Sequence, residues 1–162
     1  MDLYIIRHGD AQPLGEDGIK DDAERPLTAA GHAQCRPLAA TLLRQGVGLE
    51  HLVTSPLLRA RQTAEGLLKE FGSSKPELHT CDHLVPSGKR RKLTRFLRGL
   101  SAQSVGIVGH RPDLNLYLGW LIGSRQVQID LAKSGVACVH FDDEVDKGNG
   151  SLTWLITPQW CE

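Results

Sequence analysis

The chain has 162 residues, of which 40% are hydrophobic and 23% charged, and its formal net charge at pH 7 is zero. This length and composition predict one globular domain over residues 1–162. The balanced charge argues against a dedicated nucleic-acid-binding protein, which needs basic surface to displace counterions. No apolar run reaches membrane-spanning length, and Met1 leads into a predicted strand rather than a signal peptide. We therefore expect a cytoplasmic protein, monomeric by preference, that binds neither nucleic acid nor membrane.

The cysteines are scattered and form no CxxC pair that would hold zinc or exchange disulfides; they are Cys35, Cys81, Cys138 and Cys161. We interpret them as buried free thiols. No second ligand cluster accompanies the histidines that flank Cys81, so we expect no metal and no cofactor. Five histidines show no partner pattern and are interpreted as structural: His32, His51, His79, His83 and His140.

The first predicted element is a short apolar strand over residues 3–6, which ends in Arg7-His8-Gly9. A cation and an imidazole are thereby placed at the carboxyl edge of a sheet, where open α/β sheets bind ligands. Gly9 allows a turn with positive φ and a close approach of a ligand to the backbone. A polar surface loop over residues 10–25 follows.

A helix is predicted over residues 28–45, with Thr28 as its N-terminal cap. Pro37 lies inside this helix and removes a backbone donor, which predicts a kink or a division into two shorter helices. A strand over residues 51–55 follows. It runs directly into Ser55-Pro56, which we interpret as a helix cap and a proline at the first helical position.

The rest of the chain continues the alternation of strands and helices and ends in two strands joined by a short acidic turn. In order, it predicts a strand at 77–80, a basic amphipathic helix at 89–100, a strand at 104–108 ending in Gly109-His110, a helix at 112–122, and strands at 136–141 and 152–157. The last two strands suggest an antiparallel hairpin. We therefore predict a three-layer α/β/α fold around a mixed, mostly parallel sheet.

Three predicted strand ends carry reactive side chains: Arg7 and His8 after the first strand, Arg59 shortly after the second, and His110 after a later one. If these strands are adjacent and parallel, two guanidinium groups and two imidazoles converge without a carboxylate among them. Such a site fits a tetrahedral dianion, because each arginine can hydrogen-bond two oxygens. His8 is the natural nucleophile, and neighbouring cations would keep it unprotonated. Arg7, Arg59 and His110 would stabilise the charge of the transition state.

The chain resembles the histidine phosphatase superfamily, also called the phosphoglycerate mutase-like family. Three motifs carry the resemblance, in the usual order: Arg7-His8-Gly9, the segment SPLLRARQT at 55–63, and Gly109-His110. The short length and the segments RHGDA, RPLT and GHRPD are similar to the SixA-type phosphohistidine phosphatases. The resemblance covers nearly the whole chain and implies the phosphoglycerate mutase-like fold.

By this resemblance His8 carries a transient phosphoryl group, and Arg7, Arg59 and His110 form the phosphate pocket. Arg25, in the RPLT segment, is a weaker candidate for the same pocket. The implied enzyme is a phosphohistidine phosphatase that needs no metal, since the arginines supply the positive charge. Its partner would be a histidine-phosphorylated signalling or phosphotransfer protein.

The general acid is not evident in the sequence. Mutase-like members carry a glutamate in a longer insertion, but the corresponding segment here, 77–88, is short and holds only Glu77 and Asp82. Asp10, which follows the first motif, is a further candidate. We interpret all three as surface carboxylates. A phosphohistidine releases an imidazole more easily than an ester releases an alkoxide, so we predict poor activity on alkyl phosphate esters.

Two other functions remain open at this point. The chain could act on small phosphate esters, or shuttle a phosphoryl group as a mutase, with the same nucleophile. It could instead be an adaptor that binds phosphate without turnover. The basic run over residues 89–98 is either a solvated helix face or a docking surface for an acidic phosphoprotein.

Overall fold

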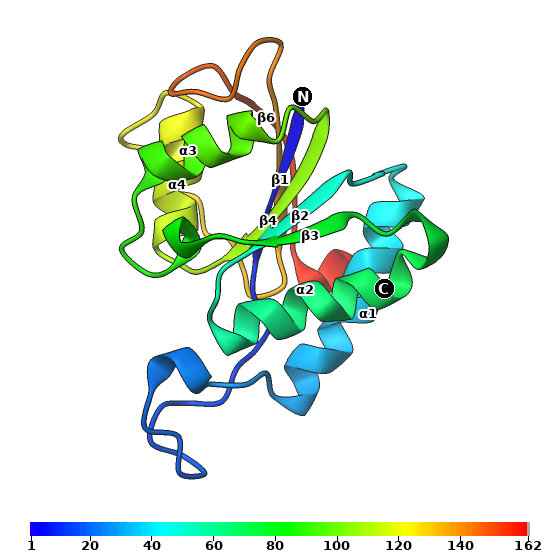
Figure 1. The fold of residues 1–162 in the computed structure, drawn as a ribbon, viewed down its shortest axis with the longest axis vertical. Coiled ribbons are helices and arrows are strands. Elements are labelled where there is room, and N and C mark those ends of the chain that lie inside the picture. Colours follow the sequence, from blue (N-terminus) through cyan, green and yellow to red (C-terminus); the bar gives the residue numbers. More distant parts are fainter. Residues whose placement is uncertain (162) are drawn as a thin grey trace.

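A computed structural model describes residues 1–161 as a six-stranded sheet with two helices on each face (Figure 1). The strands are β1 (Asp2–Arg7), β2 (His51–Thr54), β3 (Glu77–Thr80), β4 (Ser104–Gly109), β5 (Val136–His140) and β6 (Ser151–Ile156). The helices are α1 (Ala29–Arg44), α2 (Leu58–Glu70), α3 (Arg90–Gly99) and α4 (Asp113–Leu121). Within residues 1–161, no helix combines the length and apolar character needed to cross a membrane.

The sheet has the order β3-β2-β4-β1-β5-β6, with α1 and α2 on one face and α3 and α4 on the other. Alternating side chains of β1 pack into the two hydrophobic cores, one on each face of the sheet. Leu3 and Ile5 pack in the same cluster as leucines of α3 and α4, whereas Tyr4 and Ile6 pack with those of α1 and α2. The predicted α/β/α architecture with a mixed, mostly parallel sheet is confirmed.

The three strands that end in reactive residues are neighbours and run in the same direction. β4 lies between β1 and β2 and pairs with both in parallel, with Arg7 opposite Gly109 and Thr54 opposite Val108. The predicted convergence of their carboxyl ends on one edge is therefore confirmed. β5 runs antiparallel to both β1 and β6, which confirms the hairpin.

Helix α1 differs from its prediction at Pro37. The Thr28 hydroxyl accepts a hydrogen bond from Gly31 N at 3.0 Å, which confirms the cap, but the helix continues through Pro37 to Arg44 without division. Cys35 and Leu38, which lie on either side of Pro37, are both buried. The expected division into two helices is therefore wrong, because packing on both sides of Pro37 offsets the missing donor.

Candidate active site

Two imidazoles lie together at the carboxyl edge of the sheet, and we refer to His8 and His110 as the inner histidine pair. His8 follows β1 and His110 follows β4, and their ring centroids are 5.0 Å apart. His8 is 8% exposed and His110 is 2% exposed. The strand register brings these two residues together although 101 other residues separate them in the sequence.

The hydrogen bonds of His8 identify the nitrogen that can react. Its Nδ1 lies 2.7 Å from the carbonyl oxygen of Gly9, and because a carbonyl only accepts, Nδ1 carries the hydrogen. The lone pair is then on Nε2, which accepts a hydrogen bond from Nε of Arg59 at 3.3 Å. Nε2 is therefore the ring nitrogen of His8 that carries an available lone pair.

Both members of the inner pair are neutral at pH 7. Burial lowers the pKa of His8 to about 4, and the charges of Arg59, Arg7 and Arg25 act in the same direction, while the hydrogen bond to Gly9 opposes them. Burial also lowers the pKa of His110 to about 3, with further contributions from His8 and Arg59. The nearby cations contribute as expected from the sequence, but desolvation is the larger cause.

Arg59 and Arg25 converge on one carboxylate, that of Asp22 in a short 3-10 helix (Asp22–Glu24). Nη2 of Arg59 donates to Oδ2 of Asp22 at 2.9 Å, and Nη1 of Arg25 donates to Oδ1, also at 2.9 Å. Nη1 of Arg59 donates to the main-chain oxygen of Asp22 at 2.6 Å. The carboxylate of Asp22 therefore occupies donors of both arginines, and one of these arginines also contacts Nε2 of His8.

Asp22 was not among the residues expected from the sequence. It is one of several acidic residues in a polar loop, and nothing in the local pattern separates it from the others. Burial alone would raise the pKa of Asp22, but hydrogen bonds from Arg25 and Arg59 outweigh this effect and lower it. Asp22 is thus ionised at neutral pH and serves as an internal anion for the two arginines.

Two buried nitrogens of the site have no hydrogen-bond partner among the described residues: Nε of Arg7 and Nδ1 of His110. Nη1 of Arg7 donates to the carbonyl oxygen of Leu131 at 3.0 Å, which holds the guanidinium group in place. Buried polar groups without a partner are rare in folded proteins and call for an explanation. Both nitrogens therefore keep an unused hydrogen-bonding capacity.

Ser55 has a different role from the helix cap expected of it. Helix α2 begins at Leu58, and no side chain caps it. The Ser55 hydroxyl instead lies 2.9 Å from Nε2 of His110 and is fully buried. It therefore fixes the orientation of the His110 ring, a function that the sequence motif alone did not reveal.

Gly9 also differs from its prediction, because it does not adopt a positive φ. A Cβ at this position would lie 3.0 Å from the carbonyl oxygen of Gly31, so a larger residue would crowd the backbone at the start of α1. Gly9 N donates to the Thr63 hydroxyl at 3.0 Å, and this hydroxyl donates to the carbonyl oxygen of Arg59 at 2.7 Å. One side chain thus connects the turn after His8 with the helix turn that carries Arg59.

The acidic residues suggested by the sequence lie outside this arrangement. Asp10 accepts hydrogen bonds from Lys133 at 2.5 Å and from the Thr28 hydroxyl at 2.8 Å. These bonds lower the pKa of Asp10, so it is ionised and has no proton to donate. Asp82 is exposed in a short 3-10 helix, and Glu77 lies at the first residue of β3, the opposite end from the carboxyl edge.

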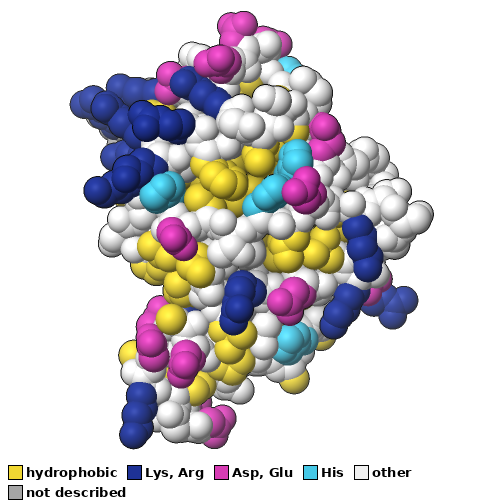
Figure 2. All heavy atoms as spheres, viewed as in Figure 1, with side chains coloured by type: hydrophobic (Ala, Val, Ile, Leu, Met, Phe, Trp, Pro, Cys, Tyr) yellow, Lys and Arg dark blue, Asp and Glu magenta, His cyan; other side chains and the backbone are white. Residues whose placement is uncertain are grey.

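A pocket of about 220 Å³ adjoins His110. Its lining includes Leu84, Leu93, Leu114, Leu116 and Tyr117, together with the polar residues His83, Arg90 and Asp113. Leu116 is 61% exposed, so it leaves an apolar side chain at the rim. Basic side chains gather on the surface over α3, at the upper left of Figure 2. One of them, Arg98, is bound to Asp146 at 2.8 Å.

Comparison with known proteins shows similarity over the full length. Residues 3–85 match a family described as the histidine phosphatase superfamily, branch 1. The chain is 30% identical to the phosphohistidine phosphatase SixA of Escherichia coli K12, covering 98% of this chain and 94% of that protein. It is 34% identical to a protein of Picosynechococcus sp., with coverage of 99% and 98%. The solved structure of the protein histidine phosphatase SixA complexed with tungstate superposes with a TM-score of 0.85, at 29% identity and 98% coverage of both chains.

Proposed function

Since the chain belongs to the histidine phosphatase superfamily, we propose that it is a cytoplasmic, metal-independent phosphohistidine phosphatase acting on a signalling or phosphotransfer protein. The observation that carries the proposal is the unprotonated Nε2 of His8, held beside Arg59 with the other ring nitrogen bound to the Gly9 carbonyl. Full-length similarity to a phosphohistidine phosphatase supports the substrate class. The tungstate complex of the similar structure supports a site for a tetrahedral oxyanion.

In the first step, Nε2 of His8 attacks the phosphorus of the phosphohistidine on the substrate protein. A new N–P bond forms at His8 as the bond to the substrate imidazole breaks, and the released imidazole takes a proton from solvent. Arg7, Arg59 and Arg25 stabilise the negative charge on the transferring oxygens. His110 is neutral, and its free Nδ1 can accept a hydrogen bond or, as the other tautomer, donate one.

In the second step, water attacks the phosphorus on His8 and the N–P bond breaks. Inorganic phosphate leaves, and the lone pair returns to Nε2. The low pKa of His8, about 4, favours both steps. The free enzyme keeps its nucleophile unprotonated at neutral pH, and a weakly basic imidazole is a good leaving group.

Asp22 must leave the arginines before a phosphoryl group can bind in its place. The exchange replaces one carboxylate by a group of higher negative charge, so the electrostatic attraction of Arg59 and Arg25 favours the substrate. Asp22 keeps the two guanidinium groups aligned and paired in the free enzyme. This contact avoids the cost of burying Arg59, 3% exposed, as an uncompensated charge.

The carboxylates near the site favour a phosphoramidate over an ester as the substrate. Asp22 and Asp10 both have lowered pKa values, so neither holds a proton for an alkoxide leaving group at neutral pH. An imidazole leaving group can take its proton from water. The pocket beside His110, about 220 Å³, is also smaller than the 300–1,000 Å³ range of typical metabolite sites, which suits a side chain presented by a protein.

The surface around the pocket suits a protein partner. Leu116 at the rim offers apolar contact, and Arg90 connects the pocket with the basic surface of α3. Arg98 is bound to Asp146 and Glu144 within the chain, so it contributes less free charge than its position suggests. We therefore place the docking surface at the amino end of α3 rather than along the whole helix.

The decisive experiment compares hydrolysis of a histidine-phosphorylated protein with that of an aryl phosphate, in the presence of a chelator. We expect strong preference for the phosphoprotein, no loss with the chelator, and no activity in His8→Ala. His32→Ala, which replaces an exposed histidine of α1, is the matched control and should retain full activity.

Preference for the aryl phosphate would assign the chain to the ester phosphatases of the same superfamily. Phosphate binding without turnover of either substrate would favour an adaptor. Trapping a phosphoryl group on a residue other than His8 would contradict the proposed mechanism.

A further inference from the structure

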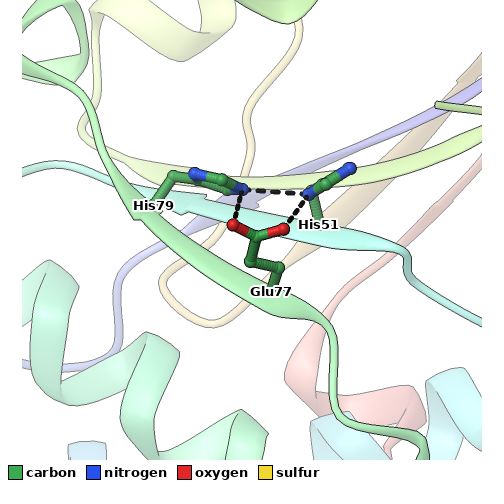
Figure 3. Close-up of side chains that lie close together, drawn as sticks. All are labelled: His51, Glu77 and His79. Carbon is green, nitrogen blue, oxygen red and sulfur yellow. Dashed lines mark hydrogen bonds and ion pairs between the residues drawn. The ribbon is translucent and has the colours of Figure 1, made fainter. Parts of the chain in front are cut away.

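A second group of imidazoles lies at the opposite end of β2 and β3, where these strands begin. His51 is the first residue of β2, Glu77 is the first residue of β3, and His79 follows two residues later. Figure 3 shows the three side chains pointing toward one another. We refer to His51 and His79 as the edge histidine pair. The sequence showed no partner pattern for either histidine, and the structure corrects this interpretation.

The sheet fixes the relative positions of the three side chains. The parallel register places His51 opposite Glu77 and Val53 opposite His79, so all three functional side chains lie on one face of the sheet. On this face the His79 ring packs against Phe96 of α3, with ring centroids 6.3 Å apart. The side chains of His51 and His79 are 18% and 22% exposed. Two paired strands and the contact with Phe96, rather than loops, therefore hold these side chains in place.

The distances between the ligand atoms of the group are compatible with one shared metal ion. Nδ1 of His51 lies 2.9 Å from Nε2 of His79, which is a hydrogen-bond distance. The two oxygens of Glu77 lie 3.7 Å from these same nitrogens, which is too long for hydrogen bonds. Two ligand atoms bound to one zinc ion, at about 2.0–2.1 Å each, can be at most about 4.2 Å apart. All the observed separations lie within this limit.

We propose that Nδ1 of His51, Nε2 of His79 and a carboxylate oxygen of Glu77 bind one zinc-class divalent transition-metal ion. Two imidazoles and a carboxylate are ligands typical of zinc and its neighbours, whereas magnesium and calcium prefer sets made of oxygen alone. Glu77 is 68% exposed, which leaves a path for the ion and room for water at the remaining position. Among the described residues, this is the only group of three such side chains close enough together to bind a metal.

The site is separate from the proposed reaction. It lies where β2 begins, whereas Ser55 and the inner histidine pair lie beyond the end of that strand. A bound ion would connect β2 with the edge strand β3. It should therefore raise thermal stability without being needed for turnover, so the proposal does not depend on the phosphatase assignment.

The test is a titration of the chelator-treated, full-length protein with zinc by calorimetry, and with cobalt(II) followed by visible absorption. We expect one equivalent of each ion and a rise in melting temperature with zinc. His51→Ala and His79→Ala should each lose at least about tenfold in affinity, the lower bound seen when groups supporting a metal ligand are removed. Glu77→Gln, which keeps both imidazoles and a similar side-chain shape, should also weaken binding.

Two variants serve as controls. His32→Ala removes an exposed histidine elsewhere, and His8→Ala removes an imidazole of the inner pair; both should retain full zinc affinity. The cysteine thiols Cys35, Cys81, Cys138 and Cys161 are buried and free, so they do not compete in the folded protein. If a histidine variant does not fold, Glu77→Gln still tests the site. Absence of binding, binding unaffected by Glu77→Gln and both edge variants, or loss of binding in His8→Ala would overturn the proposal.

Discussion

Two pairs of histidines lie at opposite ends of the parallel strands, and the ring geometry within the two pairs is closely similar. The ring centroids are 5.0 Å apart in the inner pair, His8 and His110, and also 5.0 Å apart in the edge pair, His51 and His79. The angles between ring planes are 52° and 50°. The inner pair follows the paired strands β1 and β4, and the edge pair lies on the paired strands β2 and β3. The geometry of the imidazoles alone therefore does not distinguish the two sites.

The surroundings of the two pairs differ in charge and in access to water. Arg7 and Arg59 accompany the inner pair, and burial lowers the pKa of both its histidines. Glu77 accompanies the edge pair, and it is largely exposed. An array of cations around neutral imidazoles attracts an anion, whereas a carboxylate beside them attracts a cation. The comparison indicates that neighbouring charges select the ligand.

The largest expected effect is that of His8→Ala. Because it removes the proposed acceptor of the phosphoryl group, turnover of a phosphohistidine protein should fall by about 10⁴-fold or more. Radiolabelled phosphate should no longer be trapped on the chain after acid-free quenching. Residual covalent labelling in this variant would mean that the inner pair does not supply the nucleophile, and the functional contrast between the two pairs would fail.

Removing an arginine that lies beside the inner histidine pair should have the next largest effect. Arg59→Ala takes away donors to the transferring oxygens, and kcat should fall by about 10²–10³-fold. Arg61→Ala, an exposed arginine two residues further along α2, is a suitable control and should change kcat by less than about twofold. An equal loss in the two variants would indicate a general effect on α2 rather than a specific role for Arg59.

The inner pair should also make folding stability depend on pH. Folding lowers the pKa of His8 to about 4 and of His110 to about 3, so the unfolded chain binds more protons as the pH falls below about 6.5. Stability is therefore full above about pH 6.5 and is lost as the pH falls toward 4 and 3. We expect a loss of about 1–2 kcal/mol per histidine between pH 7 and pH 5.

Denaturant unfolding at a series of pH values measures this dependence. His110→Gln should reduce the slope of stability against pH over the same interval, even if it lowers stability at every pH. An unchanged slope in that variant would show that the loss arises elsewhere in the chain.

The smallest expected effect concerns the internal anion. Asp22→Asn replaces the carboxylate by a neutral amide, which competes less for Arg59 and Arg25. Inorganic phosphate should then bind on the order of tenfold more tightly, a change of about 1.4 kcal/mol, as measured by competitive inhibition. Asp17→Asn, an exposed change in the same loop, is the control. Weaker phosphate binding in Asp22→Asn would mean that Asp22 aligns the arginines more than it competes for them.

The sequence was sufficient to predict the fold and to bring the main site residues to one place. Hydrophobic strands ending in Arg7-His8-Gly9 and Gly109-His110 made the parallel arrangement a natural expectation, and the register of β1 and β4 confirms it. Local rules failed where tertiary packing decides the outcome. Pro37 does not divide α1, and Gly9 is needed for its approach to Gly31 rather than for a positive φ.

The side chains missed in the sequence share one property, since each acts through a contact distant in the chain. Ser55 contacts His110, and Asp22 contacts Arg59, with 54 and 36 residues between the partners. The edge pair needs the pairing register of β2 with β3, because a shift of one residue would move His79 to the other face. Propensities and motifs do not contain this information.

The double hydrogen bond of Thr63 has a kinetic consequence. Its hydroxyl joins the turn that carries His8 to the helix turn that carries Arg59, so thermal motion displaces nucleophile and phosphate-binding group together. We therefore expect Arg59 to stay close to His8 while a substrate enters. The motion that the proposed reaction needs is the departure of Asp22, which belongs to a mostly exposed segment. Because Asp22 is hydrogen-bonded to Arg59, its departure and the proposed chemistry are coupled through one guanidinium group.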